Sequence, residues 1–214
     1  MSLPDGVERQ GFDGHERLAT RGEPVYGEPT DGPWRLWDAG RSKVGAMLQL
    51  GVDTGLAGGD AVLYLGAASG TTASHIADFC GPTYAVEFAP RPARDLVGVA
   101  AKRQNLFPLL KDARRPDAYA HVVESGLDAI VQDVATRGQA RVAARNRQFL
   151  RPDGRLIAAI KARSEDVTAA PENVFAAVLD DLRDAYEVLE TARLDRHHDD
   201  HLAVIARPRP DTID

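Results

Sequence analysis

Residues 62–75 read VLYLGAASGTTASH, and this stretch decides the fold class. The apolar run at 62–65 predicts a short buried strand, and the small residues after it predict a turn that opens into a helix. Glycines at 66 and 70 allow backbone conformations that side chains disfavour, so a ligand can lie directly against the main chain. The stretch therefore predicts a binding turn for a nucleotide-like ligand.

The spacing of the two glycines separates two kinds of nucleotide-binding turn. A dinucleotide fold has Gly-x-Gly-x-x-Gly after its first strand, whereas this chain has three residues between Gly66 and Gly70. The next apolar run ends at Glu87, whose carboxylate can accept hydrogen bonds from ribose hydroxyls. This arrangement favours a class I methyltransferase that binds S-adenosylmethionine, with the methionine carboxylate near the helix N-terminus. An NAD-dependent oxidoreductase is disfavoured, while a strand-turn-helix unit without a ligand stays open.

The composition of the chain limits the class of protein. Its 214 residues suffice for one domain of ordinary size with a small appended unit. No apolar run approaches the roughly 20 residues of a membrane span, and no basic segment leads an apolar core, so we expect a soluble, cytoplasmic protein without a membrane partner. The single cysteine, Cys80, offers no disulfide and no cysteine cluster for a metal. A net charge of -6 argues against nucleic-acid binding by bulk electrostatics alone.

The first 50 residues differ in pattern from the rest of the chain. Residues 1–50 are rich in Gly, Pro and charge, and they predict a small antiparallel β unit with strands near 16–19, 24–26 and 34–36, followed by a connecting helix at 43–50. Residues 51–210 predict a methyltransferase domain, and residues 211–214 a tail. The strands expected in the domain lie at 61–66, 83–88, 106–110, 127–132, 155–161, 185–194 and 201–207.

Strands that alternate with helices predict an α/β fold with a mostly parallel sheet covered on both faces. The last two strands are too close for a helix between them, so they predict an antiparallel hairpin with an antiparallel edge strand. Seven strands with such a hairpin are typical of the Rossmann-like class I methyltransferase sheet. Ligands bind beyond the carboxyl ends of these strands. The candidate cofactor-binding residues there are Gly66, Ala67, Ser69, Gly70, Thr71, Thr72, Glu87, Phe88, Asp112, Ala113, Asp133, Val134, Ala135 and Thr136.

Two of these candidates have expected contacts with an adenine ring. Asp112 follows the third strand and suits the adenine amino group, and Phe88 suits the face of the ring. A turn-forming or helix-capping role is equally open for Asp112.

Several runs of residues together resemble fibrillarin in its archaeal fibrillarin-like form. They are 41–43 (RSK), 66–72 (GAASGTT), 84–88 (YAVEF), 94–97 (RDLV), 112–114 (DAR), 133–135 (DVA), 160–164 (IKARS) and 200–201 (DH), spread over nearly the whole chain. The resemblance implies an RNA 2'-O-methyltransferase that uses S-adenosylmethionine. It also implies a ribonucleoprotein in which box C/D guide RNAs direct methylation of rRNA and tRNA, with a Nop-type scaffold protein and a kink-turn-binding, ribosomal-protein-like subunit as partners.

Carried over by position, the catalytic set of the family falls on Lys43, Asp133, Lys161 and His201. A ribose 2'-hydroxyl must lose its proton while its oxygen attacks the methyl carbon of a sulfonium. Lys161 can accept that proton only as a neutral amine, which burial or a neighbouring cation such as Lys43 favours. Asp133 would hold Lys161 and the methyl end of the cofactor, and His201 would orient the ribose or pass the proton on. The division of these roles stays open.

The choice of lysine is itself informative. Only four of the 26 Lys and Arg side chains are lysines, and two of those occupy this set. Arginine cannot release its proton in a protein, whereas lysine can. A strand-end or helix-start charge without a catalytic role is the alternative for both lysines.

Other polar residues predict a function less specifically. The tract at 197–201 resembles a metal site, but a spacing of four aligns ligands on a helix and not along a hairpin, so we expect no metal. Arg137, Arg141 and Arg145 would stripe one face of a helix, where a solvated face is favoured over RNA contact. His75 is expected to pack or cap and not to act as a catalyst.

The chain departs from the family pattern at two places. Thr136 and Arg137 stand where the family has Gln-Pro, and residues 37–40 (WDAG) stand where it has Trp-Asn-Pro-Phe. A glutamine contact to the cofactor is therefore in doubt, with the Thr136 hydroxyl as its replacement, and the loop at 37–40 is expected to differ in shape. A methyltransferase for protein or small molecules, and a catalytically silent ribonucleoprotein subunit, are the alternative functions.

Overall fold

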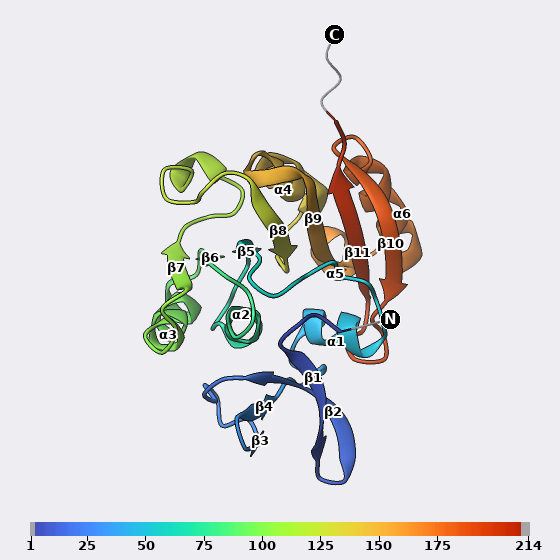
Figure 1. Ribbon diagram of the computed structural model, residues 1–214. Helices are drawn as coiled ribbons and strands as arrows, with labels where there is room; N and C mark the ends of the chain where they lie inside the picture. The colour runs from blue at the N-terminus through green and yellow to red at the C-terminus, as the bar shows by residue number, and fades with distance from the viewer. Residues whose placement is uncertain (1–2, 211–214) are drawn as a thin grey trace.

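A seven-stranded sheet forms the centre of the protein, as a computed structural model of residues 3–210 shows (Figure 1). Its strand order is β10-β11-β9-β8-β5-β6-β7. The strands are β5 (Val62–Leu65), β6 (Thr83–Glu87), β7 (Leu106–Leu110), β8 (Leu127–Gln132), β9 (Leu150–Lys161), β10 (Tyr186–Arg193) and β11 (His201–Pro208). All seven strands expected from the sequence are present, and the expected α/β methyltransferase fold is confirmed. Residues 1–2 and the expected tail at 211–214 lie outside the described residues.

The strand directions match the expected mostly parallel sheet with an antiparallel terminal hairpin. Strands β5 to β9 pair in parallel, and β11 pairs antiparallel with both β9 and β10. The antiparallel strand β11 lies one position inside the edge, which β10 forms. The expected antiparallel hairpin at the edge is therefore confirmed, with its last strand, β11, inserted between β9 and β10.

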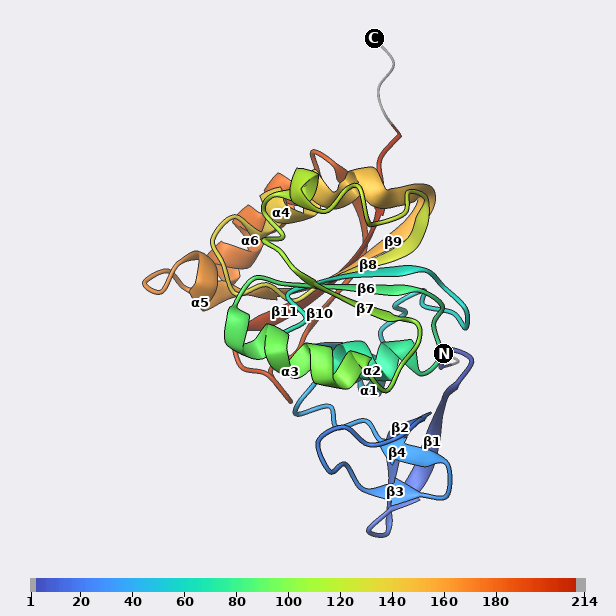
Figure 2. The same cartoon turned by 90° about the vertical axis from the view of Figure 1, so that its left-hand side faces the viewer.

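Helices cover both faces of the central sheet (Figure 2). One face carries α1 (Lys43–Gln49), α2 (Thr71–Ala77) and α3 (Pro90–Ala100), and the other carries α4 (Gln139–Asn146), α5 (Ala162–Glu165) and α6 (Pro171–Leu182). Two short 3-10 turns, η1 (Pro116–Ala118) and η2 (Arg147–Phe149), join the elements of the second face. Within residues 3–210, the helices lack the length and apolar content that a membrane crossing requires.

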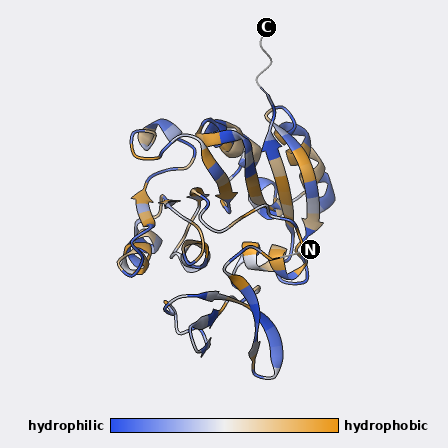
Figure 3. Ribbon diagram, in the orientation of Figure 1, coloured by the Kyte–Doolittle hydropathy of each residue, from blue (hydrophilic) through white to orange (hydrophobic). Residues whose placement is uncertain are grey.

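The core consists of two apolar layers, one on each face of the sheet. The four residues of β5 are all buried, because their side chains point alternately into the two layers. Colouring by hydropathy shows the same pattern, with apolar residues concentrated on the central strands (Figure 3). Because β5 is buried on both faces, its sequence is an uninterrupted apolar run, and that run made the strand predictable.

A second, four-stranded antiparallel sheet lies below α1 and α2 in Figure 1. It contains β1 (Val7–Phe12), β2 (His15–Arg21), β3 (Thr30–Asp31) and β4 (Trp34–Leu36), in the order β1-β2-β4-β3. Its inner residues Val7 and Leu18 belong to the same apolar layer as α1 and α2. The expected β unit is therefore present, and it is packed onto the central fold.

The strand expected at 24–26 is wrong. The carboxylate of Glu28 accepts hydrogen bonds from the backbone N–H groups of Val25 and Tyr26, and Pro24 has no N–H to offer a sheet. These residues form a turn, and the missing strand is β1. It pairs with β2 through a tight turn at Asp13 and Gly14, both at positive φ.

Candidate active site

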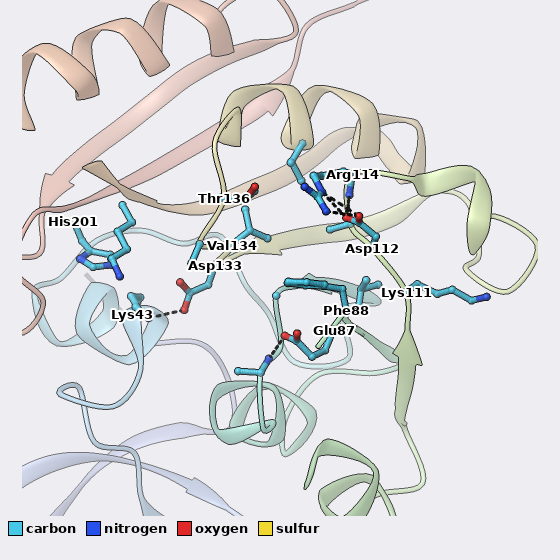
Figure 4. A pocket seen from close by; sticks show the side chains of 17 residues that line it. Lys43, Glu87, Phe88, Lys111, Asp112, Arg114, Asp133, Val134, Thr136 and His201 are labelled. Atoms are coloured by element: carbon cyan, nitrogen blue, oxygen red, sulfur yellow. Dashed lines mark hydrogen bonds and ion pairs between the residues drawn. The ribbon is translucent and has the colours of Figure 1, made fainter. Parts of the chain in front are cut away.

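A cavity of about 370 Å³ opens at the carboxyl ends of the parallel strands (Figure 4). Segments that follow β5, β6, β7 and β8 form its wall, together with the last residue of β9, the first residue of α1 and the first residue of β11. The lining residues are Lys43, Gly66, Ala68, Val86, Glu87, Phe88, Lys111, Asp112, Ala113, Arg114, Asp133, Val134, Ala135, Thr136, Val142, Lys161 and His201. Five successive strand ends therefore meet at one site, as the fold rule predicts.

Most of the residues named from the sequence lie in this wall. All four members of the catalytic set do, as do Gly66, Glu87, Phe88, Asp112, Ala113 and 133–136. The wall does not include five residues of the first turn and helix start, namely Ala67, Ser69, Gly70, Thr71 and Thr72. Ala68 and Arg114, which belong to the runs at 66–72 and 112–114, also line the wall. Val86, Lys111 and Val142 line it without having been predicted; Val86 and Lys111 directly precede Glu87 and Asp112, so proximity to a predicted residue was the available signal.

Close packing explains the glycines of the first turn. Gly66 has φ +81, and a Cβ there would lie 2.3 Å from the backbone oxygen of Asp133. Gly70 has φ +88, and a Cβ there would lie 2.7 Å from Leu96 on α3. The first glycine thus lets the turn pass against the end of β8, while the second lets α2 pack on α3. Thr72 does not line the cavity, and its hydroxyl donates to Ser42 Oγ at 3.0 Å.

One end of the cavity carries a carboxylate and an exposed aromatic ring. Glu87 is buried, and its oxygens accept the N–H groups of Ala68 (2.9 Å) and Ala89 (2.8 Å). A carboxylate has about four lone-pair sites, so acceptor capacity is left for hydroxyls in the cavity. Phe88 is 65% exposed, and Figure 4 shows its ring beside Glu87 in the cavity. An apolar ring that faces solvent beside an acceptor is suited to stacking with a nucleoside base.

Asp112 lies at the same end and is engaged by one neighbour. The Arg114 guanidinium donates to both of its oxygens, from Nε at 2.9 Å to Oδ1 and from Nη2 at 2.7 Å to Oδ2. The backbone N–H of Arg114 also donates to Oδ1 at 2.9 Å. These hydrogen bonds lower the pKa of Asp112, so the group is an ionised acceptor at neutral pH. The alternative role of Asp112, as a turn-forming residue, is therefore also observed, because its carboxylate holds the turn at 112–114.

The other end of the cavity holds Lys43, Asp133 and His201 (Figure 4). Ser42 caps α1 by accepting the N–H of Gly45 at 3.0 Å, so Lys43 is the first residue of that helix. Lys43 Nζ lies 2.9 Å from Asp133 Oδ2. Lys161 and His201 are direct partners in the antiparallel ladder of β9 and β11, which puts their side chains on the same face of the sheet.

His201 is held as a neutral ring with a defined tautomer. It is 8% exposed, and its Nδ1 lies 2.7 Å from the backbone oxygen of Asp199. Burial lowers the pKa of His201, and the charge of Lys43 lowers it further against the opposing hydrogen bond to Asp199. Since a carbonyl oxygen only accepts, Nδ1 carries the proton. Nε2 is left as a proton acceptor.

The remaining histidines have structural contacts. The ring of His75 stacks on Trp37, with centroids 4.9 Å apart, and its Nδ1 lies 2.7 Å from Thr20 Oγ1. Its predicted packing role is confirmed. In the tract at 197–201, His198 Nε2 lies 2.8 Å from the backbone oxygen of Ala39. Among the described residues, no group of three or more His, Cys, Asp or Glu side chains is arranged to hold a metal ion.

The structure also settles the shape of the two unusual segments. Thr136 lines the cavity, whereas Arg137 precedes α4, so only Arg141 and Arg145 of the expected arginine stripe lie on that helix. In the loop at 37–40, Asp38 Oδ1 accepts the N–H of Gly40 at 2.8 Å. That loop is therefore a closed turn next to α1.

Comparisons with known proteins show the family to which the chain is similar. The Fibrillarin family model matches residues 11–210. A fibrillarin-like rRNA/tRNA 2'-O-methyltransferase of Halorubrum lacusprofundi is 70% identical over 208 residues, which are 97% of this chain and 98% of the relative. The protein of that name from Haloarcula marismortui is 68% identical over 211 residues, 99% of this chain and 100% of the relative.

Solved structures show the same similarity at the level of the fold. Fibrillarin in a fibrillarin/Nop5p complex superposes with a TM-score of 0.89 at 36% identity, covering 98% of this chain and 100% of the other. Aeropyrum pernix fibrillarin with natively bound S-adenosyl-L-methionine gives a TM-score of 0.79 at 41% identity, covering 96% and 100%. With a family model over nearly the whole chain and relatives above two-thirds identity, this chain belongs to the fibrillarin family.

Proposed function

We propose that this protein transfers a methyl group from S-adenosylmethionine to ribose 2'-hydroxyls of rRNA and tRNA, as the catalytic subunit of a box C/D ribonucleoprotein. The observation that carries the proposal is the two-ended cavity. One end has a carboxylate and an exposed aromatic ring suited to adenosine, and the other has a Lys-Asp-Lys-His group suited to removing a hydroxyl proton. Family membership supports the same reaction, since relatives of high identity bear the name of a 2'-O-methyltransferase.

The residues present fit S-adenosylmethionine. A cavity of about 370 Å³ lies in the usual range of small-molecule sites. Glu87 would accept the ribose hydroxyls, Phe88 would stack on the adenine, and Asp112 would accept from its amino group. When bound, the cofactor supplies an electrophilic methyl group on a sulfonium. Gly66 and Ala68 would leave main chain exposed along the ligand.

At the reactive end, the protein would hold and move a proton. Lys161 would take the proton of the 2'-hydroxyl, and the Nε2 of His201 would orient the hydroxyl or accept the proton onward. Lys43, fixed by its ion pair with Asp133, would contribute positive charge next to the developing alkoxide. The direct pairing of Lys161 and His201 across two strands supports a joint role, because rigid elements hold side chains in reactive geometry.

Other subunits would bring the substrate to this site. A chain of net charge -6 has little general attraction for RNA. Base pairing with a guide RNA would choose the nucleotide, and a Nop-type scaffold with a kink-turn-binding subunit would dock the enzyme on the guide. The complex of a similar fibrillarin with Nop5p supports the scaffold partner.

Reconstitution with a guide RNA, scaffold and kink-turn-binding subunit tests the proposal directly. With labelled S-adenosylmethionine, we expect one methyl group on the guided nucleotide and none when its 2'-hydroxyl is replaced by hydrogen. Label on the deoxy target would contradict ribose methylation. Failure of the chain to bind S-adenosylmethionine would assign it a structural role in the complex.

The base is tested by Lys161→Arg in the same complex. Arginine keeps the charge and cannot release its proton, so we expect methyl transfer to fall by roughly 10²- to 10⁴-fold while the cofactor Kd stays unchanged. Retained methylation by Lys161→Arg would remove Lys161 from the role of base.

A further inference from the structure

Strand β9 runs past its neighbour β8 at the reactive end. Their ladder ends where Gln132 pairs with Ala158, and three more residues of β9 follow, up to Lys161. Backbone polar groups on a covered strand need partners when the neighbouring strand stops. The side chain of Gln139 provides them. Its Oε1 accepts the Lys161 N–H at 2.9 Å, and its Nε2 donates to the Lys161 carbonyl oxygen at 3.1 Å.

A carboxylate from α5, the short helix that follows β9, fixes the orientation of this amide. Glu165 Oε1 accepts from Gln139 Nε2 at 3.0 Å and from the Gln139 backbone N–H at 2.6 Å. Glu165 Oε2 accepts the N–H of Gly138 at 2.8 Å, so the same carboxylate caps α4. With two acceptors facing Nε2 and a donor facing Oε1, only one orientation of the amide satisfies every group.

Gln139 also connects the two strand ends that bear proposed catalytic groups, through its side chain and its backbone. Gln139 is fully buried, and its backbone oxygen accepts from Gln132 Nε2 at 3.0 Å. Gln132 directly precedes Asp133, and Gln139 grips Lys161 on the next strand. Neither Gln139 nor Glu165 lines the cavity, so the two side chains act on the site through its backbone.

We propose that Gln139 and Glu165 are positioning residues for methyl transfer, which hold the backbone of Lys161 at the register that aims its amine into the cavity. This inference rests on the proposed function. A displacement of about 1 Å in a reacting group costs roughly 10²-fold in rate, so a clamp on the strand end controls transfer without touching the cofactor.

Gln139→Met tests the clamp, because it keeps the approximate volume of the side chain and removes its hydrogen bonds. In the reconstituted complex, we expect the single-turnover transfer rate to fall roughly 10- to 100-fold, with the cofactor Kd unchanged. Glu165→Gln provides a second, milder variant that keeps the size of the side chain and one acceptor; we expect a smaller loss of the same kind. Rates at the wild-type level in both folded variants would overturn the proposal.

Asn105→Ala is the matched control. Its side-chain amide also bridges backbone carbonyls, those of Ala77, Cys80 and Gly81 at 2.8, 3.0 and 3.1 Å, but before β7 at the opposite end of the sheet. We expect this variant to lower Tm and to leave the transfer rate unchanged. A rate loss in Asn105→Ala as large as in Gln139→Met would make the effect one of general stability and overturn the positioning role.

A double-mutant cycle separates action through Lys161 from a general effect. If Gln139 acts by placing Lys161, Gln139→Met will have little further effect on the residual rate of Lys161→Ala. An equal fold-loss in both backgrounds would overturn the proposal. Wild-type activity of Lys161→Ala itself would instead contradict the proposed base, so the two failures are distinguishable.

Discussion

At the scale of single residues, the ion pair of Asp133 with Lys43 distinguishes the two lysines of the site. Its carboxylate contacts Lys43 Nζ at 2.9 Å, whereas the sequence assigned Asp133 to hold Lys161. That assignment stays a prediction. In the proposed reaction, Lys43 in this ion pair would serve as a fixed positive charge, and Lys161 would be the proposed base. The neutral His201 beside it offers a second acceptor.

His75 makes the stability of the protein depend on pH. Burial lowers its pKa well below the usual value, and the charges of Arg35 and then Arg103 lower it further. In the unfolded chain the ring takes up a proton below about pH 6.5, while in the folded protein it stays neutral. The unfolded state then binds more protons, so the free energy of unfolding falls as the pH drops below about 6.5.

We expect His75→Phe, which keeps a ring to stack on Trp37, to lose this contribution. From pH 6.5 to 5.5, wild type should lose about 1 kcal/mol more than the variant, measured by urea unfolding. Asp78, whose pKa burial raises, titrates in both proteins and cancels in the difference. Identical pH slopes for the two proteins would refute a neutral His75.

The sequence predicted which side chains reach the site better than it predicted what holds them. The four residues of the catalytic set were identified through the family resemblance, and all line the cavity. Thr71 and Thr72 were named because they follow the glycine turn, but the helix directs Thr72 toward Ser42. Nothing in a single sequence indicates that the Gln139 side chain bonds to Lys161, 22 residues away, since that contact depends on where two neighbouring strands end.

At the scale of elements, the passage of the β5–α2 turn against the end of β8 depends on Gly66. A Cβ at Gly66 would meet the Asp133 backbone oxygen at 2.3 Å, whereas Gly51, with the same φ of +81, has no atom within 4 Å of such a Cβ. We expect Gly66→Ala and Gly51→Ala to lose about 1–2 kcal/mol each from the left-handed backbone, with an added loss in Gly66→Ala from the clash.

Cofactor titration separates the two glycine variants. Because Gly66 and Asp133 both line the cavity, Gly66→Ala should raise the Kd of S-adenosylmethionine, and Gly51→Ala should leave it unchanged. An equal Kd in both variants would show that the turn accommodates a side chain without moving the site.

Elements with continuous apolar runs were predictable, and the alternating strand β10 was found as well, whereas β1 was missed. Strand β5 is buried on both faces, so its sequence is apolar throughout. Strand β1 has mostly exposed or half-buried side chains between Val7 and Phe12, and its charged residues gave no strand signal. The first residues of β9 contain Pro152 and Gly154, which predict a turn. They lie between Leu150, which pairs with Leu127, and Arg155, which pairs with Ala129, where the ladder with β8 shifts its register.

At the scale of the whole molecule, a buried charge cluster ties the small sheet to the central fold. Asp78, after α2, accepts from Arg35 of β4 at 2.7 Å and from Thr20 of β2 at 2.6 Å, and it pairs with Arg103 after α3 at 3.0 Å. Separating such groups would leave buried charges without partners, which is strongly unfavourable. These contacts therefore fix the small sheet to α2 and α3.

The net negative charge of the whole chain weakens the binding of RNA by the free protein. Proteins bind RNA without sequence preference mainly by neutralising phosphates, and a net charge of -6 opposes this. At about 150 mM salt, we expect the free chain to bind target RNA no tighter than about 10⁻⁴ M, the weak end of the nonspecific range. Binding of S-adenosylmethionine, which needs only the cavity, should be intact in the same sample.

Methylation should then require the assembled complex, and the folded enzyme alone should not be sufficient. We expect label in the target RNA only when guide RNA, scaffold and kink-turn-binding subunit are all present. A complex lacking only this chain is the control for contaminating activity. Because base pairing with the guide would supply the binding energy in the proposed complex, its affinity for the target should change with guide complementarity far more than with arginine substitutions on α4. Methylation of the target by the free chain, at the rate of the complex, would show that its own surface recognises RNA.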